Sequence, residues 1–95
     1  MPRITLYTTP YCGFCRAAKV LLQTKAVGFN EIDVSEDFGK REEMIARASG
    51  ERTVPQIFIG DRHVGGYDEL AQFEREAKLD ALLVELEAVI GTSAP

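Results

Sequence analysis

The 95-residue chain is long enough for one small domain, and its 45% hydrophobic residues are enough to form a core. The formal net charge of -4 argues against nucleic acid as a partner, because phosphates need a basic face. No apolar run approaches the ~20 residues of a membrane span, and the N-terminus lacks the pattern of a secretory signal. We therefore expect a reducing, cytoplasmic setting.

The first third of the chain predicts a β-α-β unit. Residues 3–7 (RITLY) have apolar side chains at alternate positions and predict a buried strand. After a turn, the pattern from Phe14 onward is helical, and Gly28 is expected to cap the end of this helix. Residues 29–34 predict a second strand. Both cysteines of the chain therefore lie at the junction between the first strand and the helix.

The middle of the chain predicts another helix and then a hairpin. An amphipathic helix is expected within residues 35–50, with Gly50 closing it. Residues 56–59 and 63–65 predict two strands joined by a Gly60-Asp61 turn.

Residues 67–91 are expected to be helical, with a bend between Ala77 and Leu79, and residues 91–95 are expected to be a frayed tail. The resulting order is β-α-β-α-β-β-α within a single domain of residues 1–95. A parallel β-α-β unit followed by an antiparallel hairpin predicts an α/β fold with a mixed four-stranded sheet and helices on its faces.

The pair Cys12 and Cys15 has three interpretations: a disulfide staple, part of a metal site, or a reactive dithiol. A disulfide between them would close a very small loop and constrain little of the unfolded chain. Two cysteines and the one histidine of the chain do not complete a four-ligand zinc site. A Cys-x-x-Cys pair between a strand and a helix favours the redox dithiol.

The position of the pair predicts different roles for the two thiols. Cys12 precedes the helix, where unpaired N–H groups and the positive end of the helix dipole stabilise a thiolate. Cys15 falls about one turn into the helix and should be more buried. We expect Cys12 to be the nucleophile and Cys15 the resolving thiol. Arg16 and Lys19 add positive charge nearby, unless they are simply solvated.

Two further segments carry features of a binding site. In "RTVPQIFI", Pro55 stands directly before a strand, where it is either an ordinary trans turn proline or a cis proline that exposes the backbone of Val54 to a peptide-like substrate. In "VGGYDEL", two glycines precede an acidic helix start. The helix N–H groups there suit a carboxylate and Asp68 suits an ammonium, although Asp68 is equally suited to cap the helix.

Two other polar residues receive a more ordinary interpretation. His63 is expected to be a surface or rim side chain on its short strand. Arg41 belongs to a charged segment that is most simply a solvated helix face, from which it could still reach a substrate carboxylate.

Together, "YCGFC", "TVPQIFI" and "VGGYDEL" resemble the glutaredoxins, and the similarity runs from about Arg3 to Leu83. The resemblance implies a thioredoxin fold and a monomer that reduces protein disulfides and glutathione mixed disulfides with reduced glutathione. It implies that Cys12 forms the glutathione mixed disulfide. The implied glutathione-binding residues are Tyr11, Phe14, Thr53, Val54, Pro55, Gly66, Tyr67 and Asp68.

The chain also departs from the glutaredoxin pattern. Many dithiol members read Cys-Pro-Tyr-Cys where this chain has Gly13 and Phe14, and a lysine is common where it has Thr9. The loss of that lysine should weaken one glutathione contact. "CGF" is also similar to the Cys-Gly-Phe-Ser of monothiol members, which bind a [2Fe–2S] cluster between two subunits. A glutathione-ligated cluster-binding dimer is therefore the alternative.

Overall fold

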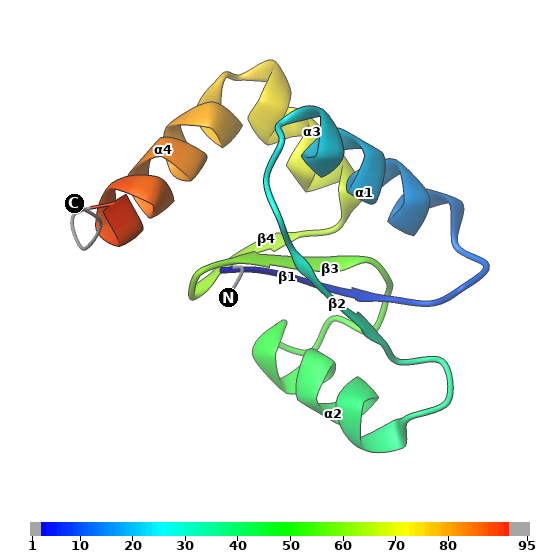
Figure 1. Ribbon diagram of the computed structural model, residues 1–95. Helices are drawn as coiled ribbons and strands as arrows, with labels where there is room; N and C mark the ends of the chain where they lie inside the picture. Colours follow the sequence, from blue (N-terminus) through cyan, green and yellow to red (C-terminus); the bar gives the residue numbers. More distant parts are fainter. Residues whose placement is uncertain (1–2, 92–95) are drawn as a thin grey trace.

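The computed structural model describes the backbone of residues 3–91 and the side chains of residues 3–84 (Figure 1). In chain order the elements are β1 (Ile4–Thr8), α1 (Gly13–Thr24), β2 (Asn30–Asp33), α2 (Phe38–Arg47), β3 (Gln56–Ile59), β4 (Arg62–Gly65), α3 (Tyr67–Arg75) and α4 (Lys78–Gly91). The expected order is confirmed, except that the C-terminal helical segment is divided into two helices. No helix within these residues is both long enough and apolar enough to span a membrane.

The four strands form one mixed sheet in the order β2-β1-β3-β4. β1 and β2 are parallel, whereas β3 is antiparallel to both β1 and β4. The right-handed crossover expected of a β-α-β unit is supplied by α1. This topology brings the C-terminal end of β1, which leads to the cysteines, beside the N-terminal end of β3, where Tyr7 pairs with Gln56.

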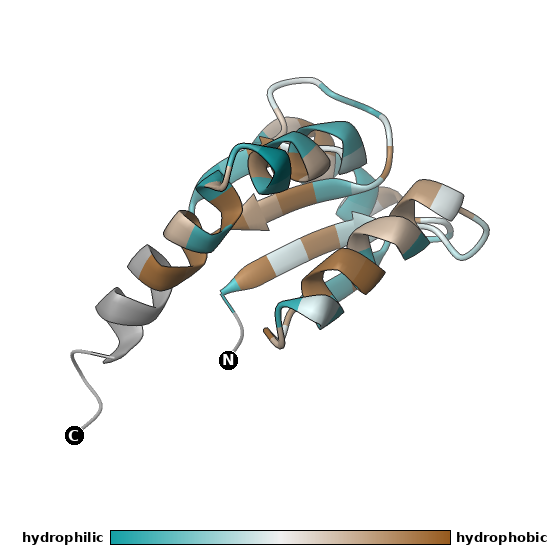
Figure 2. Cartoon of the chain, turned by 90° about the horizontal axis from the view of Figure 1, so that it is seen from above, coloured by the Kyte–Doolittle hydropathy of each residue, from teal (hydrophilic) through white to brown (hydrophobic). Residues whose placement is uncertain are grey.

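Helices cover both faces of the sheet: α1 and α3 lie over one face and α2 over the other (Figure 1). Because side chains alternate along a strand, Ile4 and Leu6 pack into the first core with Leu22 of α1. Tyr7 and its cross-sheet neighbour Phe58 pack into the second core beneath α2. Hydrophobic and more polar segments accordingly alternate along the strands in Figure 2.

Helix ends differ from the sequence expectation in two places. α1 ends at Thr24, and Ala26 takes the left-handed conformation (φ 57°), so Gly28 is not the cap. The bend expected between Ala77 and Leu79 is a complete break between α3 and α4, because Ala77 also has a positive φ of 60°.

The expectation for Gly50 is confirmed. Its N–H donates to the Ile45 carbonyl at 2.9 Å and closes α2, while Ser49 takes the left-handed position. Of the expected tail, Gly91 is the last residue of α4, and residues 92–95 lie outside the described residues.

Candidate active site

Cys12 is the N-cap residue of α1. Its backbone is extended (φ -117°, ψ 113°), and its Sγ accepts a hydrogen bond from the Cys15 N–H at 3.1 Å. A sulfur at this position faces the unpaired N–H groups of the first helical turn and the positive end of the helix dipole. The side chain is partly exposed. Cys12 therefore combines access to a reaction partner with an environment that stabilises negative charge on sulfur.

Cys15 lies one turn further along and is buried, with 1% of its surface exposed. Burial, followed by its interaction with Cys12, raises the pKa of the Cys15 thiol to about 12. A thiol of this kind remains protonated at neutral pH and is a poor first nucleophile. Cys15 is thus more buried than Cys12, as the sequence predicts.

Lys19 and Arg16, the positive charges expected near the dithiol, have different surroundings. Lys19 forms an ion pair with Glu31 of β2 at 2.9 Å, and the same carboxylate accepts a hydrogen bond from the Thr8 hydroxyl at 2.8 Å. The hydrogen bond from Lys19 holds the pKa of Glu31 below its usual value. Lys19 is therefore partly neutralised on the β2 side of the site, whereas Arg16 is exposed.

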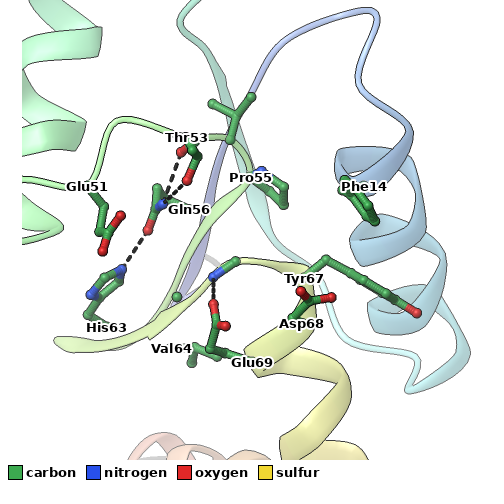
Figure 3. Close-up of a pocket in the computed structure, with 13 residues that line it drawn as sticks. Phe14, Glu51, Thr53, Pro55, Gln56, His63, Val64, Tyr67, Asp68 and Glu69 are labelled. Carbon is green, nitrogen blue, oxygen red and sulfur yellow. Dashed lines mark hydrogen bonds between the residues drawn. The ribbon is translucent and has the colours of Figure 1, made fainter.

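A groove of about 630 Å³ lies beside the dithiol between the loop before β3 and the start of α3 (Figure 3). Its lining residues are Phe14, Glu51, Thr53, Val54, Pro55, Gln56, His63, Val64, Gly65, Gly66, Tyr67, Asp68 and Glu69. The Cys12 thiol donates to the Val54 carbonyl at 3.7 Å, which connects Cys12 to the groove. The Val54–Pro55 peptide bond is cis, so Pro55 is not the ordinary trans turn proline that the sequence also allows.

The start of α3 forms the opposite wall of this groove. Gly66 is the N-cap residue, and its N–H donates to the Glu69 carboxylate at 2.7 Å. Glu69, rather than Asp68, therefore caps the helix, and the exposed Asp68 carboxylate is left beside the first helical N–H groups. Tyr67 stacks on Phe14 of α1, with ring centroids 6.1 Å apart, so that the two aromatic rings bridge the wall and the dithiol helix.

Seven of the eight residues implied as binding residues meet in this groove, and Tyr11 does not. Tyr11 is 99% exposed and is not part of the groove lining. Thr9 is partly buried and also lies outside the lining. Arg41 donates to the Arg52 carbonyl at 3.4 Å, outside the groove.

Four polar side chains of the lining are not among the residues that the sequence assigns to the site: Glu51, Gln56, His63 and Glu69. His63 was expected at a surface or rim, and it is a half-buried part of the wall. One signal in the sequence could have indicated these residues. Gln56 is a polar residue at the start of an otherwise apolar strand, and the neighbouring strand of the hairpin carries the single histidine. In the described part of the chain, no three His, Cys, Asp or Glu side chains are grouped as a metal site.

A mixed four-stranded sheet with a Cys-x-x-Cys pair at the start of the first helix defines a thiol–disulfide oxidoreductase of the thioredoxin fold. The family comparison agrees: the sequence model of the glutaredoxin family matches residues 4–64. A glutaredoxin of Pseudomonas aeruginosa is 52% identical over 83 residues, which cover 87% of this chain and 98% of the relative. This chain belongs to the glutaredoxin family.

Solved structures give the same answer. A glutaredoxin from Brucella melitensis superposes with a TM-score of 0.75 at 52% identity, covering 87% of this chain and 89% of the other. A buckwheat glutaredoxin–glutathione complex superposes with a TM-score of 0.81 at 30% identity, covering 92% and 81%.

Proposed function

We propose that this protein is a glutathione-dependent oxidoreductase that reduces protein disulfides and glutathione mixed disulfides through Cys12 and Cys15. The observation that carries the proposal is the position of the partly exposed Cys12 thiol, beside a groove lined by the Thr53–Pro55 loop on one wall and a helix N-terminus on the other. The similarity to the buckwheat protein, whose structure is a glutathione complex, supports the choice of ligand.

The chemistry of the groove suits an anionic tripeptide with a γ-linked glutamyl end. The first N–H groups of α3, at Tyr67 and Asp68, can receive the α-carboxylate of that residue. The exposed Asp68 carboxylate can pair with its ammonium group. The backbone of Val54 can pair with the tripeptide next to Cys12, with Thr53 and Pro55 on either side of it.

Two features at the dithiol end complete the proposed contacts. Phe14 forms the wall beside the thiol. Thr9 provides no charge for the glycine carboxylate, so binding depends more on the α3 end. A Thr9→Lys variant should therefore have a lower KM for glutathionylated substrates than the wild type.

The reaction proceeds by thiol–disulfide exchange. The Cys12 thiolate attacks the glutathione sulfur of a mixed disulfide, and the S–S bond breaks to release the other protein as its thiolate. A second glutathione thiolate then attacks the sulfur of glutathione bound to Cys12. This step forms oxidised glutathione and regenerates the Cys12 thiolate. The net reaction therefore consumes one free glutathione, because the other glutathione of the oxidised product is the one that the mixed disulfide carried.

With a protein disulfide, Cys15 takes the second step. Cys12 forms a mixed disulfide with the substrate, and Cys15 loses its proton as it attacks the Cys12 sulfur, releasing the reduced substrate. The oxidised dithiol is then reduced by two glutathione molecules. A reducing compartment such as the cytoplasm suits this cycle, because glutathione must be kept reduced.

A glutathione-coupled reductase assay on the wild type, Cys12→Ser and Cys15→Ser tests the proposal. Cys15→Ser should still reduce glutathione mixed disulfides, since glutathione resolves them, but should fail on protein disulfides that need both thiols. Cys12→Ser should be inactive on both, and activity in this variant would refute the assignment of the nucleophile. A visible spectrum of protein purified anaerobically with glutathione tests the cluster-binding alternative, which requires iron–sulfur absorbance and a dimer.

A further inference from the structure

We propose that Gln56 and His63 are positioning residues that hold the Thr53–Val54 backbone in the shape required for substrate binding. The proposal rests on the proposed function, because it concerns the same groove. It assigns a role to a buried amide and to the single histidine, neither of which takes part in the chemistry at sulfur. Figure 3 shows the three side chains in a row, with dashed lines from His63 to Gln56 and from Gln56 to Thr53.

Gln56 anchors the loop that precedes β3. Its Nε2 donates to the Thr53 carbonyl at 3.0 Å and to the Thr53 hydroxyl at 3.2 Å. Only 2% of Gln56 is exposed, so the donor of these two hydrogen bonds is shielded from water. Thr53 itself is exposed and belongs to no strand or helix. The Gln56 side chain therefore connects a loop without regular structure to the rigid sheet.

His63 determines the orientation of the Gln56 amide. The Gln56 Nε2 faces two acceptors of Thr53, so the Gln56 Oε1 faces His63. This oxygen lies 2.6 Å from the His63 Nε2. A carbonyl oxygen accepts only, so the His63 Nε2 carries the proton. This holds for the neutral Nε2–H tautomer as well as for the cation. A histidine in the other tautomer would leave a buried acceptor unpaired, which is costly.

The imidazole is held in place by the sheet behind it. It stacks on Phe58 of β3, with ring centroids 4.8 Å apart and planes inclined by 25°. The Arg47 guanidinium of α2 contacts the same Phe58 ring at 4.2 Å from its centroid. The His63 ring is therefore held by its contact with Phe58 of the second core. Its hydrogen bond in turn limits the orientations of the Gln56 amide.

The other end of this hydrogen-bonded row reaches the nucleophile. Thr53 is bonded directly to Val54, whose carbonyl accepts from the Cys12 thiol at 3.7 Å. Thr53 and Val54 both line the groove. If the row were lost, the Val54 backbone would lose its support on the side away from Cys12. The expected consequence is weaker substrate binding with little change in the chemical step.

Three variants separate positioning from stability. Gln56→Met keeps the volume and removes both hydrogen bonds to Thr53. His63→Phe keeps an aromatic ring on Phe58 but removes the donor, whereas His63→Gln removes the ring and keeps a donor near the Nε2 position. Leu79→Ala is the control, because Leu79 is fully buried in the first core and lies outside the groove lining.

The experiment measures steady-state kinetics with a glutathionylated peptide, well below each variant's melting temperature. Gln56→Met and His63→Phe should raise KM about tenfold and leave kcat within about twofold, the effect of an unpaired buried polar group on binding. His63→Gln should restore KM to within about threefold of the wild type, and Leu79→Ala should lower only the melting temperature. An unchanged KM in Gln56→Met and His63→Phe would refute the proposal and leave the pair a purely structural one.

A second readout does not depend on turnover. In NMR spectra, the backbone amide signals of Thr53 and Val54 should shift in Gln56→Met and remain in place in Leu79→Ala. An inactive wild type would refute the proposed function, and these signals would still decide whether Gln56 positions the loop. Unshifted signals in Gln56→Met would overturn the positioning role whatever the activity.

Discussion

Gly65 offers a test of how the groove wall is built. It ends β4 with a φ of +119°, a conformation that residues with a side chain rarely adopt. A Cβ at this position would lie 2.7 Å from the Glu69 Oε1 and 3.0 Å from its Cγ. That carboxylate is the cap of α3, where it accepts from the Gly66 N–H at 2.7 Å. A Gly65→Ala substitution would therefore strain the backbone and displace the cap together.

The expected cost is the sum of these two effects. A residue forced into a sparsely populated backbone region costs about 1–3 kcal/mol, and loss of a helix cap costs about 0.5–2 kcal/mol. We expect Gly65→Ala to lower the free energy of unfolding by roughly 1.5–5 kcal/mol. For a domain of this size each kcal/mol corresponds to roughly 4–8 °C in melting temperature.

Two other glycines separate the contributions. Gly50 also has a positive φ, +95°, but a Cβ there would meet nothing within 4 Å, so Gly50→Ala measures backbone strain alone. A Cβ on Gly13 meets nothing within 4 Å either, and its φ is not positive, so Gly13→Ala should be neutral or stabilise by up to ~1 kcal/mol. Urea unfolding under reducing conditions gives the three values. If Gly65→Ala costs no more than Gly50→Ala, the contact with Glu69 carries no energy and the reasoning is wrong.

Three further predictions concern the cores and the dithiol. Leu22→Ala should destabilise by about 2–5 kcal/mol in urea unfolding, because Leu22 is fully buried, whereas the half-exposed Val20→Ala should stay within about 0.5 kcal/mol; equal effects would contradict the assigned helix face. Tyr7→Phe should cost about 0.5–1.5 kcal/mol by the same measurement, since the buried hydroxyl donates to a carboxylate and accepts from Arg47; an unchanged stability would mean that these bonds contribute nothing. Burial raises the pKa of Cys15 to about 12, above the ~8.5 of an unfolded chain, so unfolding releases a proton between these values and the free energy of unfolding falls as pH rises. Cys15→Ala should show a shallower fall between pH 8.5 and 10, and identical slopes would argue against the raised pKa.

The strands and the place of the cysteines could be predicted because the signals are local. Alternation in residues 3–7 and the apolar run at residues 57–59 are each sufficient to indicate a buried strand. The helix end at Gly28 could not be predicted in this way. A glycine is a good cap, but Ala26 takes the left-handed position first, and no local pattern forbids that.

Some residues of the candidate site could also be predicted from local sequence, and others could not. Val54, Pro55, Gly66 and Asp68 carry backbone or charge properties that are evident from their neighbours in sequence, and all four reach the groove. Tyr11 carries no such property. It adjoins Cys12 in sequence, yet its side chain is almost fully exposed.

By itself, the sequence determined the dithiol at a helix start, the two glycine- and proline-containing segments beside it, and the order of strands and helices. Each of these follows from periodicity or from the chemistry of a few adjacent residues. Local patterns do not reveal that Glu69 caps α3, that Lys19 is paired with Glu31, or that His63 reaches Thr53 through Gln56. The physical reason is that such contacts depend on sheet register and side-chain rotamers, which bring together groups from separate elements only after the chain has folded.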